Sequence, residues 1–338
     1  MTLQYKTVLI TGGAGAIGTR LIQKLAPVCK KIVVLDNLSS GYTWNIPNIP
    51  NLLFIKGDIT SDIDLRRSFK ESPDIVFHLA AFFANQNSVD YPQKDLHTNG
   101  VGTLKLYEYC ALYGRLERVV YASSGCSIYG KHDMPYVEEK TDLMNLTTPY
   151  QITKGLGEVY GNYFIHQHNL PLTYARFFNS YGPGEVPGQY RNVIPNFIYW
   201  AKHKMSLPIT GTGEETRDFT YVDDIINGLI MMATSDPDLV VGEAFNLAAG
   251  REVKVIDLAT MINNLADNKD NIIFKPRRNW DEKPRLLASN KKARETLDFK
   301  VEEDFNEGLA KTVKWFDKHW PTIEASANFG PGFSSAVR

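Results

Sequence analysis

Tyr150 and Lys154, in the segment PYQITK, are the two residues whose types and spacing most directly suggest chemistry. Side chains four residues apart lie on one face of a helix. A phenol with a pKa of about 10 is a poor base at neutral pH, but a neighbouring ammonium group favours the phenolate. The pair is therefore predicted to act as a general base for a substrate hydroxyl. Because such pairs also occur by chance on helix surfaces, this prediction depends on the rest of the chain.

A third reactive group is expected in the segment YASSGCSIYG, residues 121–130, where hydroxyls surround Cys126. The segment follows a strand-like run, and ligands of parallel sheets bind at the carboxyl ends of the strands. Ser123, Ser124 and Ser127 are candidates for a hydrogen bond to a substrate. The competing interpretation is that these hydroxyls only cap the loop.

The segment TGGAGAIG places Gly12, Gly15 and Gly18 between the first strand and the first helix. Glycines there let the turn fold tightly and let backbone N–H groups approach a pyrophosphate at the positive end of the helix. Asp36 ends the second strand, where a carboxylate accepts hydrogen bonds from ribose hydroxyls and repels a 2′-phosphate. The order of strand, turn, helix and acid predicts a dinucleotide site that prefers NAD to NADP.

The elements that must position these residues alternate between strands and helices. Strand-like runs occur at TVLI, KIVVLD, LLFIKGD, DIVFHLAA, RVVYASS and LTYARFFNS, and helical patterns occur near residues 61–70, 95–112 and 150–167. Strands separated by helices imply right-handed crossovers and a parallel sheet. We therefore expect an α/β fold, a Rossmann-like doubly wound parallel sheet with a smaller C-terminal substrate-binding lobe.

A group of Gly and Pro residues at YGPGEVPGQYRNVIP breaks this alternation after residue 180. Residues 1–180, with returning segments at about 217–250, are predicted to form the NAD-binding domain. Residues 181–216 and 251–322 are predicted to form the smaller lobe, with the site between the two. Residues 323–338 have little to bury and are expected to form a loosely held tail.

The composition is that of an ordinary globular protein, with 338 residues, 43% of them hydrophobic and 22% charged. A net charge of −1 provides no overall attraction to nucleic acid or to an anionic membrane. The segment MTLQYKTVLITGG runs straight into a strand pattern, and no apolar run approaches the roughly 18 residues of a membrane span, so we expect a soluble protein without a signal peptide. Its 3 cysteines have no CxxC or Cys/His pairing, which argues against disulfides and a structural metal and favours a reducing cytoplasm.

Five motifs together resemble the extended short-chain dehydrogenase/reductase family, in particular its UDP-glucose 4-epimerase-like nucleotide-sugar enzymes. They are TGGAGAIG, LDNLSSG, GDI at 57–59, HLAA at 78–81 and NGVGT at 99–103, and the likeness covers nearly the whole chain. The resemblance implies that Tyr150 is the base and that Lys154 tunes it and holds the nicotinamide ribose. It also implies adenosine contacts at Asp36, Asn37, Ser40, Asp58 and Ile59, and other cofactor contacts at Gly12, Gly15, Ala16, Ile17, Leu79, Ala80, Ala81 and Asn99.

The turn after residue 124 departs from the commonest spelling of this family. The usual Ser or Thr falls at Gly125, but an SSGxxIYG spelling also occurs among the epimerases, so Ser124 is the predicted catalytic hydroxyl. Ser124 and Ser127 are also expected to contact the substrate. Related dehydratases and decarboxylases carry a carboxylate where this chain has Cys126 or Ser127, so elimination is disfavoured. Cys126 is predicted to be an apolar filler, the alternative being the acid/base role of a cysteine in GDP-mannose 3,5-epimerases.

The resemblance places a nucleoside diphosphate, with uracil as the favoured base, beside Asn179, Asn192, Val193, Arg217, Arg278 and Asp281. Arginine forks suit phosphate oxygens, and a carboxylate accepts ribose hydroxyls. Epimerases of UDP-glucuronate have Arg where this chain has Gly184 and Glu185, so a neutral or amino sugar is expected. The residue that decides whether an N-acetyl group fits is either Arg285 or Leu286.

The expected activity is that of an NAD-dependent nucleotide-sugar 4-epimerase, with UDP-hexoses favoured. The enzyme would oxidise C4 to a ketone and reduce it again from the opposite face. Alternatives are a 3,5-epimerase that uses Cys126, another oxidoreductase such as a 4-ketosugar reductase, and a non-catalytic NAD-sensing protein. The presence of Tyr150 and Lys154 argues against the sensor. The resemblance also implies a homodimer in which the helices near 95–112 and 150–167 pair.

Overall fold

The computed structural model describes residues 2–130 and 133–327. The strands are β1 (Thr7–Thr11), β2 (Lys31–Asp36), β3 (Leu52–Lys56), β4 (Ile75–His78), β5 (Arg118–Ser124), β6 (Leu172–Phe177), β7 (Ser180–Tyr181), β8 (Leu207–Thr210), β9 (Thr216–Arg217), β10 (Thr220–Tyr221), β11 (Ala244–Leu247), β12 (Val253–Lys254) and β13 (Ile272–Lys275). The α-helices are α1 (Ala16–Leu25), α2 (Asp62–Phe69), α3 (Asn85–Asp90), α4 (Pro92–Asp95), α5 (Thr103–Tyr113), α6 (Gly125–Ile128), α7 (Pro149–His168), α8 (Val193–Lys202), α9 (Val222–Thr234), α10 (Pro237–Val240), α11 (Val255–Leu265), α12 (Lys291–Leu297) and α13 (Phe305–Ser326). The 3₁₀-helices η1 (Thr43–Asn45) and η3 (Leu143–Asn145) and the π-helix η2 (Leu96–Gly102) complete the described elements.

Seven parallel strands form the large sheet, in the order β11-β6-β5-β4-β1-β2-β3. Successive side chains of a strand point to opposite faces of the sheet. In β1, Val8 and Ile10 accordingly join the core on one face and Leu9 joins the core on the other. Strands that bury both faces read as continuous apolar runs such as KIVVLD. The predicted doubly wound parallel sheet is confirmed.

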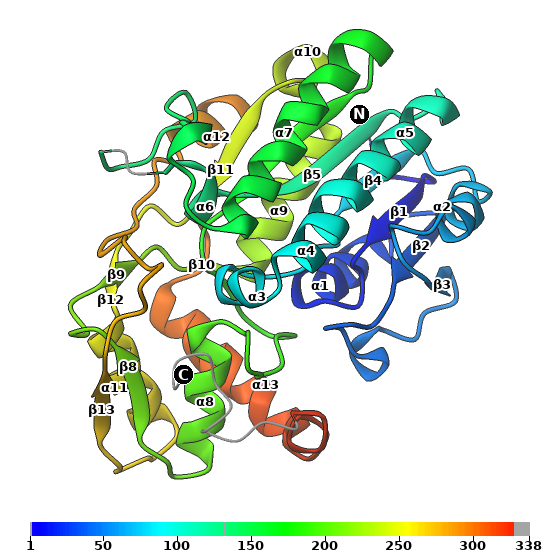
Figure 1. The fold of residues 1–338 in the computed structure, drawn as a ribbon. Coiled ribbons are helices and arrows are strands. Elements are labelled where there is room, and N and C mark those ends of the chain that lie inside the picture. The colour runs from blue at the N-terminus through cyan, green and yellow to red at the C-terminus, as the bar shows by residue number, and fades with distance from the viewer. Residues whose placement is uncertain (1, 131–132, 328–338) are drawn as a thin grey trace.

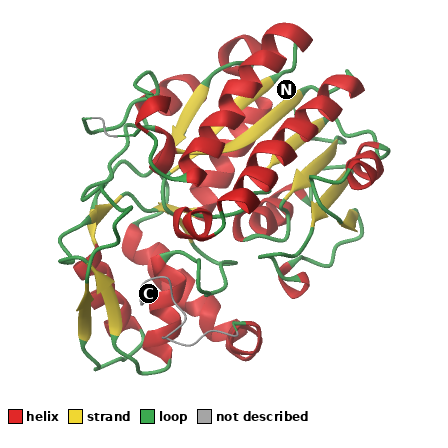
Figure 2. Cartoon of the chain, in the orientation of Figure 1, coloured by secondary structure: helices red, strands yellow, loops and turns green. Residues whose placement is uncertain are grey.

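Helices cover both faces of this sheet (Figures 1 and 2). Buried residues of α1, α9 and α12 pack on one face, and those of α2, α5 and α7 pack on the other. The segment after residue 217 therefore contributes to this layer structure twice, because α9 packs against α1 and β11 forms the edge strand beside β6. The chain reversals at the carboxyl ends of the strands thus gather on one edge of the sheet, where the candidate site lies.

The helical pattern near 95–112 is three consecutive elements in the structure, namely α4, η2 and α5. The middle element is a π-helix, whose wider turns often occur at functional sites. The pattern near 150–167 is the single helix α7, which runs beside α5 across the same face of the sheet (Figure 1). These two stretches supply most of the helical surface in front of the sheet.

A second, smaller core is built from α8, α11, α13 and the strand pair β8–β13, which lie below the sheet in Figure 1. Trp200 and Phe316 are buried at its centre. Residues 323–326 were expected to belong to a loosely held tail, but they form the end of α13, and Ile323 is fully buried. The last eleven residues of that expected tail, 328–338, lie outside the described residues.

Candidate active site

Two cavities meet at the carboxyl ends of the parallel strands. The first, the glycine cavity, is lined by the turn after β1 and by residues near the ends of β4, β5 and β6. The second, the arginine cavity, lies beside the smaller core and contains Arg217 and Arg278. Cys126, Asn179 and Arg191 line both cavities, so the two spaces join at these residues. One elongated molecule, or two molecules placed end to end, can therefore occupy both.

The turn after β1 is folded as the glycine motif predicts. Gly12 has a φ of +72°, and a β-carbon on it would lie 2.6 Å from the backbone nitrogen of Ala80. A β-carbon on Gly18 would lie 2.6 Å from the Gly12 carbonyl oxygen. Helix α1 begins at Ala16 and has no side-chain cap at Gly15, which leaves N–H groups of its first turn available to an anion. This cradle fits a pyrophosphate.

Most of the predicted cofactor residues line the glycine cavity or the recess that adjoins it beside β2 and β3. The cavity residues are Gly12, Gly15, Ala16, Ile17, Ser40, Leu79, Ala80, Ala81, Tyr150 and Lys154. The recess is lined by Asp36, Asn37, Asp58 and Ile59, together with Gly12, Ser40, Ala80 and Ala81. The adenosine half of a dinucleotide fits this recess, because the recess directly adjoins the pyrophosphate cradle at Gly12.

Asp36 is held rigidly at the end of β2. Its carboxylate accepts hydrogen bonds from the backbone nitrogens of Ala14, at 2.9 Å, and Leu38, at 2.7 Å. Burial raises the pKa of this carboxyl group, while these two hydrogen bonds and the nearby Arg191 lower it. Each oxygen keeps a lone pair for a further donor, which suits the hydroxyls of a ribose.

Tyr150 and Lys154 lie in the first two turns of α7 and are both buried. Thr148 caps this helix by accepting a hydrogen bond from the backbone nitrogen of Gln151. The Lys154 ammonium nitrogen lies 5.8 Å from the centre of the Tyr150 ring and donates to the Ala122 carbonyl oxygen at 2.8 Å. The helix thus places the phenol and the ammonium group together in the glycine cavity, as the four-residue spacing predicts.

Burial, rather than the pairing, dominates the acidity of these two groups. It lowers the pKa of Lys154 to about 8 and raises the pKa of Tyr150. The charges of Asp95 and Cys126 raise the pKa of Tyr150 further, and a hydrogen bond from Ser124 lowers it. In the protein alone, therefore, the phenol keeps its proton more firmly than the pairing by itself predicts. A positive charge or a hydrogen-bond donor brought in by a ligand would have to lower the pKa of the Tyr150 phenol before it could act as a base.

The predicted hydroxyl, Ser124, lies at the end of β5 and hydrogen-bonds both Tyr150 and the Ser127 hydroxyl, the latter at 2.9 Å. Ser123 has a different role, because its hydroxyl donates to the Glu158 carboxylate at 2.5 Å. Ser124 and Ser127 both line the glycine cavity. The structure therefore brings Ser124, rather than Ser123, to the tyrosine.

A buried polar network behind the tyrosine was not predicted. Asp95 accepts hydrogen bonds from Thr153, at 2.7 Å, and from Asn99, at 2.8 Å, and burial raises its pKa to about 6. Asn99 also holds the Phe82 backbone through two hydrogen bonds, and it lines neither cavity. The place of Asn99 along the cofactor stays a prediction, and its described contacts also make it part of this buried network. The sequence feature that could have indicated this network is the four-residue spacing of Asp95 and Asn99, which places both side chains on one face of a helix.

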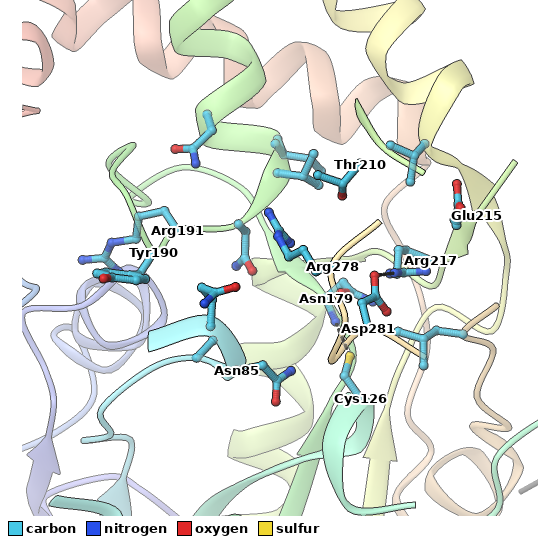
Figure 3. A pocket seen from close by; sticks show the side chains of 18 of the residues that line it. Asn85, Cys126, Asn179, Tyr190, Arg191, Thr210, Glu215, Arg217, Arg278 and Asp281 are labelled. Atoms are coloured by element: carbon cyan, nitrogen blue, oxygen red, sulfur yellow. Dashed lines mark hydrogen bonds and ion pairs between the residues drawn. The ribbon is translucent and has the colours of Figure 1, made fainter. Parts of the chain in front are cut away.

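The six predicted nucleotide contacts of the substrate line the arginine cavity, namely Asn179, Asn192, Val193, Arg217, Arg278 and Asp281. Arg217 donates to the Asp281 carboxylate at 3.0 Å, and the Arg278 guanidinium lies 5.6 Å from the centre of the Trp280 ring. Figure 3 shows Arg217, Arg278 and Asp281 gathered around Asn179 and above Cys126. Two arginines held in place by other side chains provide a preorganised site for a diphosphate.

Glu185 is not part of the lining of the arginine cavity. It lines the glycine cavity, where its carboxylate accepts a hydrogen bond from the Asn192 amide at 2.9 Å and lies near Arg191. Arg285 is exposed and pairs with Glu252, whereas Leu286 is buried and lines the arginine cavity, so Leu286 is the residue that bounds it.

Among residues 2–130 and 133–327, no cluster of His, Cys, Asp and Glu side chains is arranged to bind a metal ion. The same described part of the chain contains no helix with the length and apolar character of a membrane span. Cys29, Cys110 and Cys126 are all free thiols.

Comparison with known proteins connects this geometry to one family. Residues 8–248 match the model of the NAD dependent epimerase/dehydratase family. A UDP-glucose 4-epimerase of Mycolicibacterium smegmatis is 34% identical over 319 residues, covering 91% of this chain and 97% of that protein. The structure of the epimerase Mth375 from Methanothermobacter thermautotrophicus is 52% identical, with a TM-score of 0.94 and 96% of each chain covered.

A further solved structure carries ligands. It is the Bordetella bronchiseptica enzyme WbmF in complex with NAD+ and UDP, which is 37% identical, with a TM-score of 0.83 and 96% of each chain covered. The extent of these matches agrees with the glycine cradle, the fixed acid and the Tyr–Lys pair described above. The chain therefore belongs to the NAD-dependent epimerase/dehydratase family and uses NAD.

Proposed function

We propose that the protein is an NAD-dependent 4-epimerase of a UDP-hexose. The observation that carries this proposal is that Tyr150, Lys154 and Ser124 lie together in the glycine cavity, which joins the arginine cavity at a junction lined by Cys126 and Asn179. A sugar joined to a diphosphate in the arginine cavity would extend toward this junction, because Cys126 and Asn179 line both spaces. The C4 hydroxyl would then lie beside the phenol.

The residues of the glycine cavity would hold the cofactor, with the pyrophosphate at the turn around Gly12 and Gly15 and the adenosine ribose at Asp36. NAD bound there supplies the acceptor and later the donor of the C4 hydride. Tyr150 takes the proton of the C4 hydroxyl, and Ser124 donates a hydrogen bond that favours the phenolate. Lys154, held by the Ala122 carbonyl oxygen, orients the ribose and stabilises the developing negative charge. The same groups return the proton after the 4-keto sugar has turned over.

The α6 turn argues for simple epimerisation over water elimination. Elimination at C5 and C6 needs an acid and a base beside these carbons. Residues 125–128 are Gly, Cys, Ser and Ile, which supply no carboxylate. Among the described residues, the carboxylates that line the arginine cavity are those of Glu215, Asp281 and Glu282. Glu215 accepts a hydrogen bond from the Gly213 backbone nitrogen, and Asp281 accepts one from Arg217. This arrangement favours the C4 reaction within a family that also contains dehydratases.

The choice of UDP rests on two observations. Arg217 and Arg278 offer forked donors to a diphosphate, while Asn179 and Asn192 line the same cavity. The relative WbmF was solved with NAD+ and UDP together, and a UDP-glucose 4-epimerase is among the similar proteins. A uridine diphosphate in the arginine cavity of this chain is therefore the favoured substrate moiety.

We also propose that the enzyme is a homodimer that pairs through α5, η2 and α7. Apolar side chains on these elements are half exposed, including Leu96 at 51%, Ile152 at 51% and Tyr163 at 52%. A reducing compartment, the cytoplasm, fits the three free thiols.

The deciding experiment is a substrate screen with the protein as purified and no added cofactor. UDP-glucose, UDP-galactose, their N-acetyl forms and the two corresponding uronates are incubated separately, and the products are identified by proton NMR. The proposal expects interconversion of one C4 pair, because the cofactor is regenerated in each cycle. Failure with all six sugars, and with GDP and dTDP hexoses, would reject it. Net formation of a reduced sugar only with added NADH would instead indicate a 4-ketosugar reductase.

A further inference from the structure

The segment that follows β4 spans the junction of the two cavities. Phe83, Ala84 and Asn85 line both the glycine cavity and the arginine cavity, and α3 begins at Asn85. In Figure 1, α3 lies between the helices that cover the sheet and the smaller core. A sugar whose C4 hydroxyl lies beside Tyr150 would therefore have this segment as one of its walls.

A chain of three hydrogen bonds, which we call the clasp, joins α3 to two other segments of the site. The Trp280 indole nitrogen donates to Gln86 Oε1 at 2.7 Å, and Gln86 Nε2 donates to Asp90 Oδ1 at 2.9 Å. The Tyr190 hydroxyl donates to Asp90 Oδ2 at 2.9 Å. Trp280, Gln86 and Tyr190 all line the arginine cavity. The outer bonds join residues 194 and 100 positions apart, so the clasp bridges three separate walls of that cavity.

The other side of α3 is fixed to the helix that carries the tyrosine. Ser88 Oγ accepts a hydrogen bond from the Tyr150 backbone nitrogen at 3.0 Å, and Asn85 Oδ1 accepts one from the Thr148 hydroxyl at 2.8 Å. The rings of Phe83 and Tyr150 also meet edge to face, with 6.0 Å between their centres. Because α7 holds α3 in place, we expect the arginine cavity to open along α3 only when the clasp breaks.

The two ends of the clasp differ in their exposure to solvent. The bond between Trp280 and Gln86 is partly buried, whereas the one between Tyr190 and Asp90 is exposed. A hydrogen bond is stronger where water is excluded, because the local dielectric constant is lower there. Trp280 and Gln86 are therefore expected to provide most of the strength of the clasp. The Trp280 ring centre also lies 5.6 Å from the Arg278 guanidinium, which connects this end to the site proposed for the diphosphate.

We propose that the clasp retains the 4-keto sugar in the site between the two hydride transfers. Trp280 and Gln86 are its positioning residues, and neither takes part in bond making. This inference rests on the proposed function, because only an oxidised sugar that is reduced again in the same cycle has to be retained. The clasp links the diphosphate end of the site to α3, so it closes the wall along which the sugar would otherwise leave.

The electron balance explains why escape of the ketone matters. At that stage the sugar has given its C4 hydride to the cofactor and its hydroxyl proton to Tyr150. A ketone that leaves takes neither back, so two electrons stay on the cofactor, which remains as NADH. That protein molecule can then oxidise no further sugar. Each escape therefore leaves two products, a free 4-keto sugar and a reduced cofactor.

The test compares the purified protein, with its own cofactor, and two variants. Trp280→Phe removes the N–H donor but keeps a ring, and Gln86→Leu removes the acceptor at similar size. With a UDP-sugar that is epimerised, absorbance at 340 nm records NADH and proton NMR records C4 inversion. The NADH formed per C4 inversion should rise about fivefold in each variant, as expected for the loss of one hydrogen bond. The double variant should show no larger rise than Gln86→Leu, because both changes remove the same bond.

Matched controls carry the same replacements away from the site. Trp320→Phe and Gln93→Leu, whose residues line neither cavity, should leave the ratio unchanged. Reduction with borodeuteride followed by mass spectrometry identifies the released 4-keto sugar, which should increase together with NADH. A rise in NADH without free 4-keto sugar would indicate a stalled second hydride transfer and contradict retention by the clasp. Circular dichroism and the amount of bound NAD establish that each variant is folded.

The outcomes separate this inference from the proposed function. C4 inversion by the natural sequence, with an unchanged ratio in both variants, would overturn the clasp and leave the 4-epimerase intact. If no sugar undergoes C4 inversion, the proposed function is rejected, and the dissociation rate of each UDP-sugar, measured by surface plasmon resonance, decides on the clasp. Dissociation about fivefold faster in both variants would support the clasp as a device that holds the sugar. Equal dissociation rates would reject it.

Discussion

Phe178 occupies the space that a side chain on residue 125 would need. A β-carbon built on Gly125 would lie 1.9 Å from Cε2 of Phe178. The ring of Phe178 is fully buried and stacks near those of Tyr129 and Tyr136. The departure from the commonest family spelling at this turn therefore has a steric cause, and the catalytic hydroxyl is provided one residue earlier, by Ser124.

Gly125→Ala should destabilise the protein by about 1–3 kcal/mol, because the added methyl group forces Phe178 out of its stack. Urea unfolding measures this change. In a double-mutant cycle, Phe178→Leu should cost less when combined with Gly125→Ala than in the natural sequence. Equal costs in the two backgrounds would show that the two side chains do not compete for the same space.

Tyr150→Phe should lower turnover of the active sugar by at least about a hundredfold, the usual range for removal of a general acid–base group. The phenyl ring keeps the packing against Phe83, so the amount of NAD that copurifies should not change. Product formation by NMR and NAD released on denaturation provide the two readouts. Tyr160→Phe, on the exposed side of the same helix, is the control. A variant with nearly full turnover would contradict the assigned role of Tyr150.

Arg191 is predicted to retain the cofactor. Its guanidinium lines both cavities, donates to the Ser40 carbonyl oxygen and lies near the carboxylates of Asp36 and Glu185. Arg191→Ala removes this bridge between the two sides of the glycine cavity and should speed NAD release about tenfold, as expected for the loss of a charged hydrogen bond. Dialysis followed by chromatography of the remaining NAD measures the release. The exposed Arg67→Ala serves as the control, and equal release from both variants would reject the assignment.

His78 should make the fold sensitive to acid. It is fully buried between the hydroxyls of Thr11, at 2.7 Å, and Thr103, at 3.0 Å, and burial lowers its pKa to about 3. Neutral His78 contributes fully to the free energy of unfolding at pH values above its unfolded pKa of about 6.5. This contribution is lost as the pH falls from 6.5 toward 3, because in that range the unfolded chain binds the proton and the folded chain does not. The loss amounts to at most about 1.4 kcal/mol per pH unit.

Unfolding free energies measured at pH 6.5, 5.5 and 4.5 check this pH dependence. His78→Gln should have a flatter profile than the natural sequence, since it removes the titrating group. His166→Gln, on an exposed position of α7, should leave the profile unchanged. Parallel profiles for the His78 variant and the natural sequence would rule out His78 as the source.

The proposed dimer can be tested with a charge placed on the exposed apolar surface of α7. Ile152→Glu and Tyr163→Glu should convert the dimer to a monomer, because a buried interface would have to desolvate the carboxylate. Size-exclusion chromatography with light scattering measures the mass. Ile63→Glu, which adds the same charge at a 73% exposed position on α2, is the matched control. A natural sequence that already elutes as a monomer would reject the dimer.

The sheet, the glycine turn, Asp36 and the Tyr150–Lys154 pair could all be predicted from the order of the residues. These features depend on local rules: apolar runs form buried strands, glycine tolerates a positive φ, and residues four apart share a helical face. The family likeness then identified Ser124 and the six residues that line the arginine cavity.

Contacts between residues far apart in the sequence could be identified only from the tertiary structure. Lys283 lies against Cys126, Asp95 accepts a hydrogen bond from Thr153, and Arg191 donates one to the Ser40 carbonyl oxygen. No local pattern encodes such contacts, because they depend on how the loops at the strand ends fold over the sheet. For the same reason the acidities at the site could not be predicted from residue types, since burial outweighs pairing for both Tyr150 and Lys154.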